Sequence, residues 1–91
     1  MADIKQENGR FYIGNSDQPD AEVTFTESDD IVIEHTMVIE DKQGAGIGKQ
    51  LIDRVVDYAK KQEKQIVPVC TFAHEILSTD KKYDGVWEGP L

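Results

Sequence analysis

A glycine-rich loop joins an apolar strand candidate to an amphipathic helix candidate, and it constrains the fold more than any other feature of this chain. The loop reads Gln43-Gly44-Ala45-Gly46-Ile47-Gly48-Lys49. Glycine lets a backbone turn tightly and approach a ligand, while the first N–H groups of a helix lack internal partners and point outward at its positive end. The junction therefore predicts a cradle for an anion such as a phosphate. The alternative is a plain strand-to-helix turn that binds nothing.

The hydrophobic pattern around the loop predicts a sheet covered by one main helix. Downstream, from residue 46 to about residue 62, apolar residues recur at helical spacing. Upstream, turn residues and alternation predict an N-terminal hairpin and two further strands, over residues 4–7, 11–13, 21–26 and 31–39. For the last strand we expect alternating faces, with one face formed by Ile31, Ile33, His35, Met37 and Ile39 and the other by Val32, Glu34, Thr36 and Val38.

The C-terminal third predicts a short strand over residues 66–70, a second short helix over residues 71–77 and a less regular tail carrying Tyr83 and Trp87. Pro68 cannot donate to a sheet ladder, so this strand should have an unpaired side at the proline. A right-handed helical crossover should place it parallel to the fourth strand. The fold class is therefore α/β (α+β), with a mixed, mostly antiparallel five-stranded sheet, in a single domain covering residues 1–91.

Charge and composition exclude several functions. Eighteen acidic residues against ten basic ones give a net charge of −8, which argues against non-specific binding to nucleic acid or an anionic membrane. No segment is long enough to span a membrane, the N-terminus lacks the order of a secretory signal, and the single cysteine cannot form an internal disulfide. We therefore expect a cytoplasmic protein. One cysteine and two histidines among scattered carboxylates predict no metal site.

The loop differs from two common phosphate motifs. A Walker A sequence requires glycine where Gln43 stands and a Ser or Thr after Lys49, and a dinucleotide fingerprint requires glycine in place of Lys49. The remaining pattern, Gln43-x-x-Gly46-x-Gly48 between a strand and a helix, resembles the acetyl-CoA pyrophosphate loop of the GNAT acetyltransferases. Four strands before the loop and a strand plus helix after it also resemble that fold.

The resemblance is closer to the small GNAT-like proteins of the YjdJ type and extends over most of the chain. His35-Thr36-Met37-Val38 resembles the His-Thr-x-Val of that branch, and the Gln43 to Gly48 loop resembles its glycine loop. Val67-Pro68-Val69-Cys70-Thr71-Phe72 resembles its Val-Pro-x-Cys-x-Tyr/Phe segment, and Tyr83 falls where the branch usually has a tyrosine.

The resemblance implies that acetyl-CoA or CoA is the cofactor, with its pyrophosphate on the loop amides and its pantetheine arm beside the fourth strand. The implied cofactor-binding residues are Val38, Gln43, Gly44, Ala45, Gly46, Ile47, Gly48 and Lys49. Cys70 is the candidate thiol that accepts the acetyl group, and His35 is the candidate base that activates it or an incoming amine. For both residues the alternative is an ordinary place in the core.

The implied function is N-acetyl transfer from acetyl-CoA to an unknown acceptor, either a protein or a small amine, directly or through the thiol. Two alternatives from other classes stay open at this point. One is a non-catalytic CoA or acetyl-CoA sensor, and the other is an interaction domain whose loop binds nothing.

Overall fold

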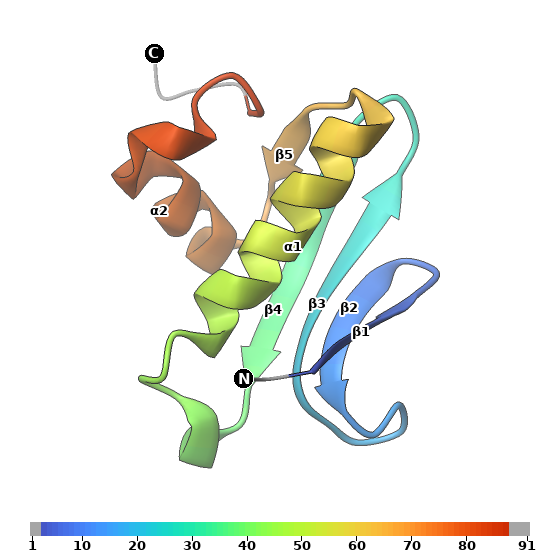
Figure 1. Cartoon of the computed structure of the whole chain (residues 1–91), viewed down its shortest axis with the longest axis vertical. Helices are drawn as coiled ribbons and strands as arrows, with labels where there is room; N and C mark the ends of the chain where they lie inside the picture. Colours follow the sequence, from blue (N-terminus) through green and yellow to red (C-terminus); the bar gives the residue numbers. More distant parts are fainter. Residues whose placement is uncertain (1–2, 88–91) are drawn as a thin grey trace.

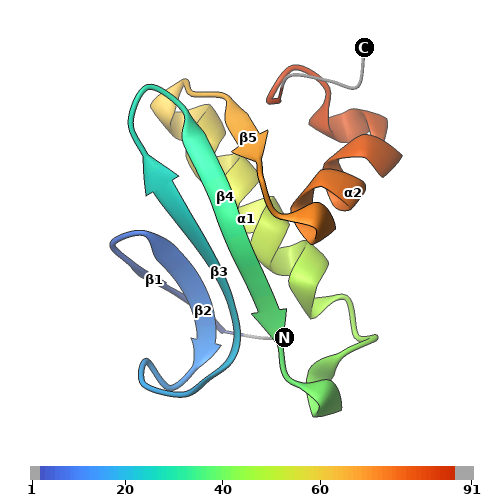
Figure 2. The same ribbon diagram turned by 180° about the vertical axis from the view of Figure 1, so that it is seen from behind.

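The computed structural model describes residues 3–87, which form one five-stranded sheet with helices against one of its faces (Figure 1). Seen from behind, the other face of the sheet has no helix of residues 3–87 over it (Figure 2). The elements in chain order are β1 (Ile4–Glu7), β2 (Arg10–Gly14), β3 (Pro19–Glu27), β4 (Ile31–Val38), the 3-10 turn η1 (Glu40–Lys42), α1 (Ile47–Gln62), β5 (Ile66–Pro68), α2 (Thr71–Thr79) and the 3-10 turn η2 (Lys81–Tyr83).

The predicted fold class is confirmed. The strands lie in the order β1-β2-β3-β4-β5, the first four are antiparallel, and β5 pairs with β4 in parallel after the α1 crossover. The N-terminal hairpin forms as predicted, with Ile4 opposite Ile13, and turns at Gly9 in a left-handed conformation that favours glycine. α1 begins and ends within one residue of its predicted bounds.

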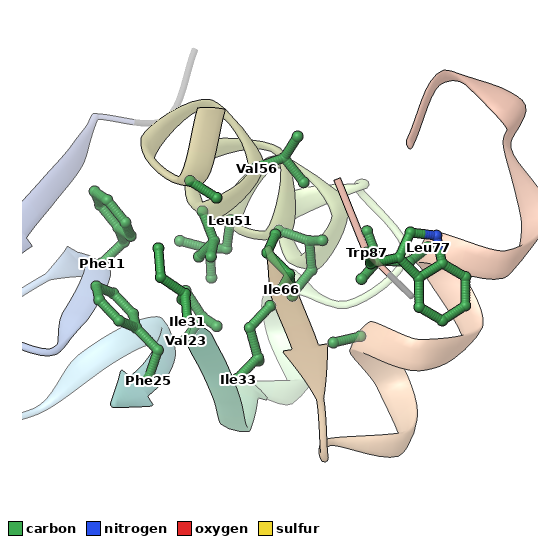
Figure 3. Packing of buried hydrophobic residues seen from close by; sticks show 14 of the residues in the cluster. Phe11, Val23, Phe25, Ile31, Ile33, Leu51, Val56, Ile66, Leu77 and Trp87 are labelled. Carbon is green, nitrogen blue, oxygen red and sulfur yellow. The ribbon is translucent and has the colours of Figure 1, made fainter. Parts of the chain in front are cut away.

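One hydrophobic core fills the space between the sheet and α1 (Figure 3). Its largest fully buried aliphatic residues come from both layers, and burying each side chain of this size stabilises the fold by roughly 1.5–3 kcal/mol: Val23, Ile31, Ile33, Leu51, Ile52, Val55, Ile66 and Leu77. The C-terminal tail completes the core, because Tyr83 and Trp87 are both buried. The Tyr83 hydroxyl donates to Asp53 Oδ1 on α1 at 2.5 Å, which fastens the tail to the helix.

A β-bulge interrupts β4 and overturns the predicted alternation of its faces. Phe25 on β3 lies opposite Ile33, but the preceding residue, Thr24, lies opposite His35, so Glu34 is an extra residue on β4. Directly opposite residues in a sheet share a face. Val23, which is fully buried, lies opposite Thr36, so Thr36 faces the core side of the sheet.

The bulge therefore exchanges the predicted faces of β4 beyond residue 34. Ile31 and Ile33 share their face with Thr36 and Val38, and the prediction that they share it with His35 and Met37 is wrong. The physical reason is that one inserted residue shifts the two-residue period of a strand by one, so every later side chain changes face. His35 lies opposite Thr24 on the face that carries no helix.

β5 is short and separates from β4 soon after they pair. Its three residues lie beside Ile31, Val32 and Ile33, and the backbone N–H groups of Val69 and Cys70 both donate to the Ile33 carbonyl before the chain enters α2. Within residues 3–87, β5 is an edge strand, which agrees with the unpaired side predicted at Pro68. No helix in this part of the chain is long and apolar enough to cross a membrane.

Candidate functional site

A groove of about 570 Å³ runs from the glycine loop along the end of β4 toward the start of α2. That volume lies in the range of small-molecule sites. Its lining combines the loop with residues from three elements: Thr36, Val38, Lys42, Gln43, Gly44, Gly46, Ile47, Gly48, Lys49, Phe72 and Ile76. Every predicted cofactor-binding residue except Ala45 belongs to this lining, so loop and β4 do meet in one cavity.

The loop end of the groove is shaped by backbone rather than by side chains. Gly44 and Gly46 have φ angles of 85° and 77°, in the left-handed region that favours glycine. Gly46 is the N-cap of α1, and no side chain caps the helix there. The first intrahelical bond is from Gln50 N–H to the Gly46 carbonyl, which leaves the amides of residues 47–49 without helical partners. This is the geometry of a helix N-terminal anion site.

The charge of the groove is opposite to that of the whole chain. Of residues 3–87, Lys42 and Lys49 line it and no carboxylate does, in a chain whose net charge is −8. The first turn of α1 also contains no acidic residue. A helix N-terminus and two nearby cations attract an anion locally even in an acidic protein. The groove therefore suits a ligand that carries phosphate at the loop end.

The edge of β4 beyond the bulge is available on the side from which β5 has turned away. Ile39 N–H donates to the Asp20 carbonyl on β3, so by the alternation of strand backbone groups Val38 and Thr36 direct theirs away from β3. Gln43 Nε2 donates to the Val38 carbonyl at 2.9 Å and holds the loop against the end of β4. The other backbone groups along this edge, apart from the Val38 carbonyl and the Thr36 amide that acts on Cys70, could pair with an extended ligand.

Cys70 lies just past the far end of the groove, at the N-cap of α2, and its side chain is half-buried. Its Sγ is 3.5 Å from the Oγ1 of Thr36, which lines the groove. Burial raises the pKa of the thiol, but the amides of Ala73, Phe72 and Thr36 and the Thr36 hydroxyl outweigh it, so the pKa is lowered overall. The helix start and β4 together make this thiol easier to ionise.

Phe72 closes the groove against α1, a contact that the sequence did not predict. A Cβ atom at Gly48 would lie 2.5 Å from the Phe72 ring tip, so only glycine permits this approach. The ring is 40% exposed at the rim of the groove. Thr36 was also missed as a lining residue, although both residues stand inside the motifs that carried the resemblance.

The structure does not bring His35 to the groove. Its side chain is exposed, it lies on the sheet face opposite Thr36, and it does not line the cavity. A catalytic role for His35 stays a prediction. The sequence predicts His35 beside Cys70, but Thr36 occupies that place in the structure. The other histidine, His74, is exposed on α2, with its ring edge-on to that of Trp87 and the two ring centroids 5.3 Å apart.

Comparison with known proteins places this groove in context. The family model described as GCN5-related N-acetyl-transferase matches residues 10–86. No curated protein sequence matches the chain significantly. The solution structure of a GCN5-like predicted N-acetyltransferase from Staphylococcus aureus is 34% identical, has a TM-score of 0.83, and the alignment covers 97% of this chain and 89% of that one.

Two larger proteins share the fold at lower identity. The ribosomal-protein-S18-alanine N-acetyltransferase from Escherichia coli is 16% identical with a TM-score of 0.63. The alignment covers 81% of this chain and 53% of that protein. A predicted acetyltransferase from Clostridium acetobutylicum, solved with acetyl-CoA, is 19% identical with a TM-score of 0.55, covering 82% and 55%. This chain therefore spans about half the length of either protein.

Proposed function

The chain belongs to the GCN5-related N-acetyltransferase family, and from this premise we propose that it binds acetyl-CoA in the groove and transfers the acetyl group through Cys70. Within the family we assign it to the small YjdJ-type branch, on the His35 to Val38 and Val67 to Phe72 motifs. The acceptor is an amine, on a small molecule or on a protein. The proposal carries over to this chain the cofactor with which one structural neighbour was solved.

The observation that carries the proposal is one groove with a helix N-terminus and two lysines at one end and a thiol just beyond the other. Lys42, Lys49 and the free amides of α1 suit the pyrophosphate, and the exposed edge of β4 suits the amide-containing pantetheine arm. Cys70 lies where the arm would end, beyond Thr36. Cofactor binding and thioester chemistry thus use separate residues along one path.

In the transfer step the Cys70 thiolate attacks the carbonyl carbon of acetyl-CoA. A bond forms from Sγ to that carbon, the bond from the carbon to the CoA sulfur breaks, and CoA leaves as a thiolate that takes up the proton given up by Cys70. One thioester replaces another, so the exchange requires no energy source. An amine acceptor then displaces the Cys70 sulfur, forms the amide and returns the thiol.

A second candidate is an acetyl-CoA sensor that uses the same groove without transferring to an acceptor. One observation favours the sensor: Val69, the residue before Cys70, is 66% exposed, so the thiol end lies near the surface. The two functions share the cofactor and differ in whether an acetyl group leaves Cys70.

Backbone amide shifts of isotope-labelled protein, titrated with acetyl-CoA, test the proposal together with the intact mass of the same sample. We expect shifts at Val38, residues 44–49 and Cys70, and a gain of one acetyl group that Cys70→Ala abolishes. Loss of that group on adding an amine would support transfer, whereas a stable mark would favour the sensor. Unmoved amides at millimolar ligand would overturn both candidates.

A further inference from the structure

We propose that Thr36 is the residue that positions the Cys70 sulfur for reaction, through its hydroxyl group. The inference rests on the proposed function, because it names the partner of the same thiol. Thr36 lines the groove and also contacts Cys70, so it lies between the cofactor path and the reacting atom. It is a positioning residue, since it acts through the sulfur of another side chain.

The backbone of β4 fixes the position of Thr36 beside Cys70. The bulge at Glu34 turns Thr36 to the core side of the sheet, opposite the buried Val23. Cys70 is held on its other side by its backbone, whose N–H donates to the Ile33 carbonyl at 3.1 Å. Both partners are therefore fixed by backbone pairing on the same strand, which limits the movement of Sγ relative to Oγ1.

The hydroxyl can serve the sulfur in both protonation states. With the thiol protonated, Cys70 donates to Thr36 Oγ1 at 3.5 Å. A hydroxyl is both donor and acceptor and rotates freely, so once the thiol ionises the Thr36 O–H can turn and donate to the thiolate. A side chain with only an aromatic or aliphatic end could do neither.

The groups that set the ionisation of Cys70 agree with this role. They are burial, the amides of Ala73, Phe72 and Thr36, and the Thr36 hydroxyl, and no charged side chain of residues 3–87 is among them. His35 extends from the opposite face of β4, and Glu34 at the bulge is exposed. Among these groups the Thr36 hydroxyl is the only side-chain group that hydrogen-bonds with the sulfur, so one substitution isolates its contribution.

The test is the pH dependence of Cys70 alkylation by iodoacetamide, measured without CoA between about pH 5 and pH 10. Cys70 is the only cysteine, so the reaction reports one thiol. Thr36→Val removes the hydroxyl and keeps the β-branched shape. We expect the apparent pKa of Cys70 to rise by roughly half a unit to one unit. The alkylation rate at neutral pH should then fall about two- to threefold, because a thiolate of higher pKa is also a stronger nucleophile.

Three further variants make the result decisive. Thr36→Ser should restore the original titration, because it keeps the hydroxyl. Thr24→Val is the matched control, since Thr24 is the same residue type, half-buried on the neighbouring strand with its hydroxyl near the His35 carbonyl. It should leave the pKa unchanged. His35→Gln should also leave the pKa unchanged.

Several outcomes would overturn the proposal. An unchanged pKa in Thr36→Val would remove the hydroxyl from the mechanism, an equal shift in Thr24→Val would make the effect a general one of the sheet, and a shift only in His35→Gln would give the role to the histidine. None of these readouts depends on CoA. An unchanged pKa of Cys70 would therefore not affect the amide-shift test of cofactor binding. Unmoved amides would likewise not affect the alkylation test.

Discussion

The two ends of the groove are built in opposite ways. At the loop end, two glycines in left-handed conformations and the start of α1, which no side chain caps, form the site, and residues 43–46 are exposed. At the thiol end, Thr36 and Cys70 are held half-buried between β4 and α2. Backbone conformation makes the first end, and tertiary packing makes the second.

The two ends should therefore lose function through different kinds of substitution. An exposed backbone cradle loses function when a side chain strains or blocks it, with little effect on the core. A packed side-chain pair loses function when one hydrogen-bonding atom is removed, because the surrounding packing holds its partner in place without that hydrogen bond. A substitution can disrupt one end alone, disrupt the contact between the two ends, or lie outside both.

The largest effect should come from Cys70→Ala, which breaks only the thiol end. We expect complete loss of the acetyl gain in the intact mass, while CoA affinity by calorimetry stays within about twofold of the original, because Cys70 does not line the cavity. An acetyl group still attached to the folded variant would show that the thiol is not the acceptor.

Next in size is Gly46→Val, which breaks only the loop end. A non-glycine residue at φ 77° costs about 1–2 kcal/mol, and the side chain obstructs ligand approach, so CoA affinity should fall by at least about tenfold. The alkylation rate of Cys70 should not change.

Gly85→Val is the matched control for that experiment. Gly85 also has a positive φ, 89°, with open space around its Cβ position and no contact with the groove. It should reproduce the strain without the loss of affinity. Equal losses of affinity in the two variants would mean that strain elsewhere, rather than the cradle, governs binding.

A smaller effect is expected from Gly48→Ala, which disturbs the contact of Gly48 with Phe72 that links the two ends of the groove. The new Cβ would meet the Phe72 ring tip at 2.5 Å, and the half-exposed ring can swing outward. We expect CoA affinity to fall roughly two- to fivefold, with little net change in stability because alanine favours the helix by about 1 kcal/mol. Adding Phe72→Leu should abolish the effect of Gly48→Ala, as a double-mutant cycle would measure. Additive losses would contradict the contact.

The smallest effect on the groove should come from Tyr83→Phe, which lies outside both ends. Losing the hydrogen bond to Asp53 should cost about 1 kcal/mol of unfolding free energy in chemical denaturation, with CoA affinity unchanged well below the melting temperature.

Tyr83 also gives a pH signature. Burial, followed by the bond to Asp53, raises the pKa of Tyr83 above its ordinary 10.0, so the folded state holds the proton more tightly than the unfolded state. This stabilisation is complete below about pH 10 and is lost as the pH rises further. Tyr83→Phe should flatten the alkaline loss of stability more than Tyr58→Phe, whose residue is half-exposed beside Glu27. The same slope in both variants would contradict the assignment.

The two ends also differ in how well the sequence predicts them. At the loop end, every residue that the sequence predicts to bind the cofactor, Ala45 excepted, lines the groove, because glycine positions and a helix start are local properties of the chain. Their binding role stays a prediction. The strand order followed equally from local patterns. At the thiol end, Cys70 was placed correctly at the start of α2, but its neighbour was not.

The error at the thiol end has one cause. The prediction for residues 31–39 assumed that side chains alternate between the two faces without interruption. The residue type at Glu34 gives no indication that the strand contains an extra residue there. The contact of Phe72 with Gly48 was missed for a related reason, since it depends on how α2 docks against α1. Both are tertiary properties, and only the structure supplies them.

The bulge at Glu34 has a consequence for the shape of the site. Deleting Glu34 would keep every cross-strand pair between β3 and β4, because that residue has no partner opposite. The shortened strand would keep Thr36 on the core face, because its pairing with Val23 is unchanged, but it would lose the bend that a bulge gives its strand. The same core would then carry a groove of a different shape, so the number of residues in β4, apart from their identity, sets the geometry of the cavity.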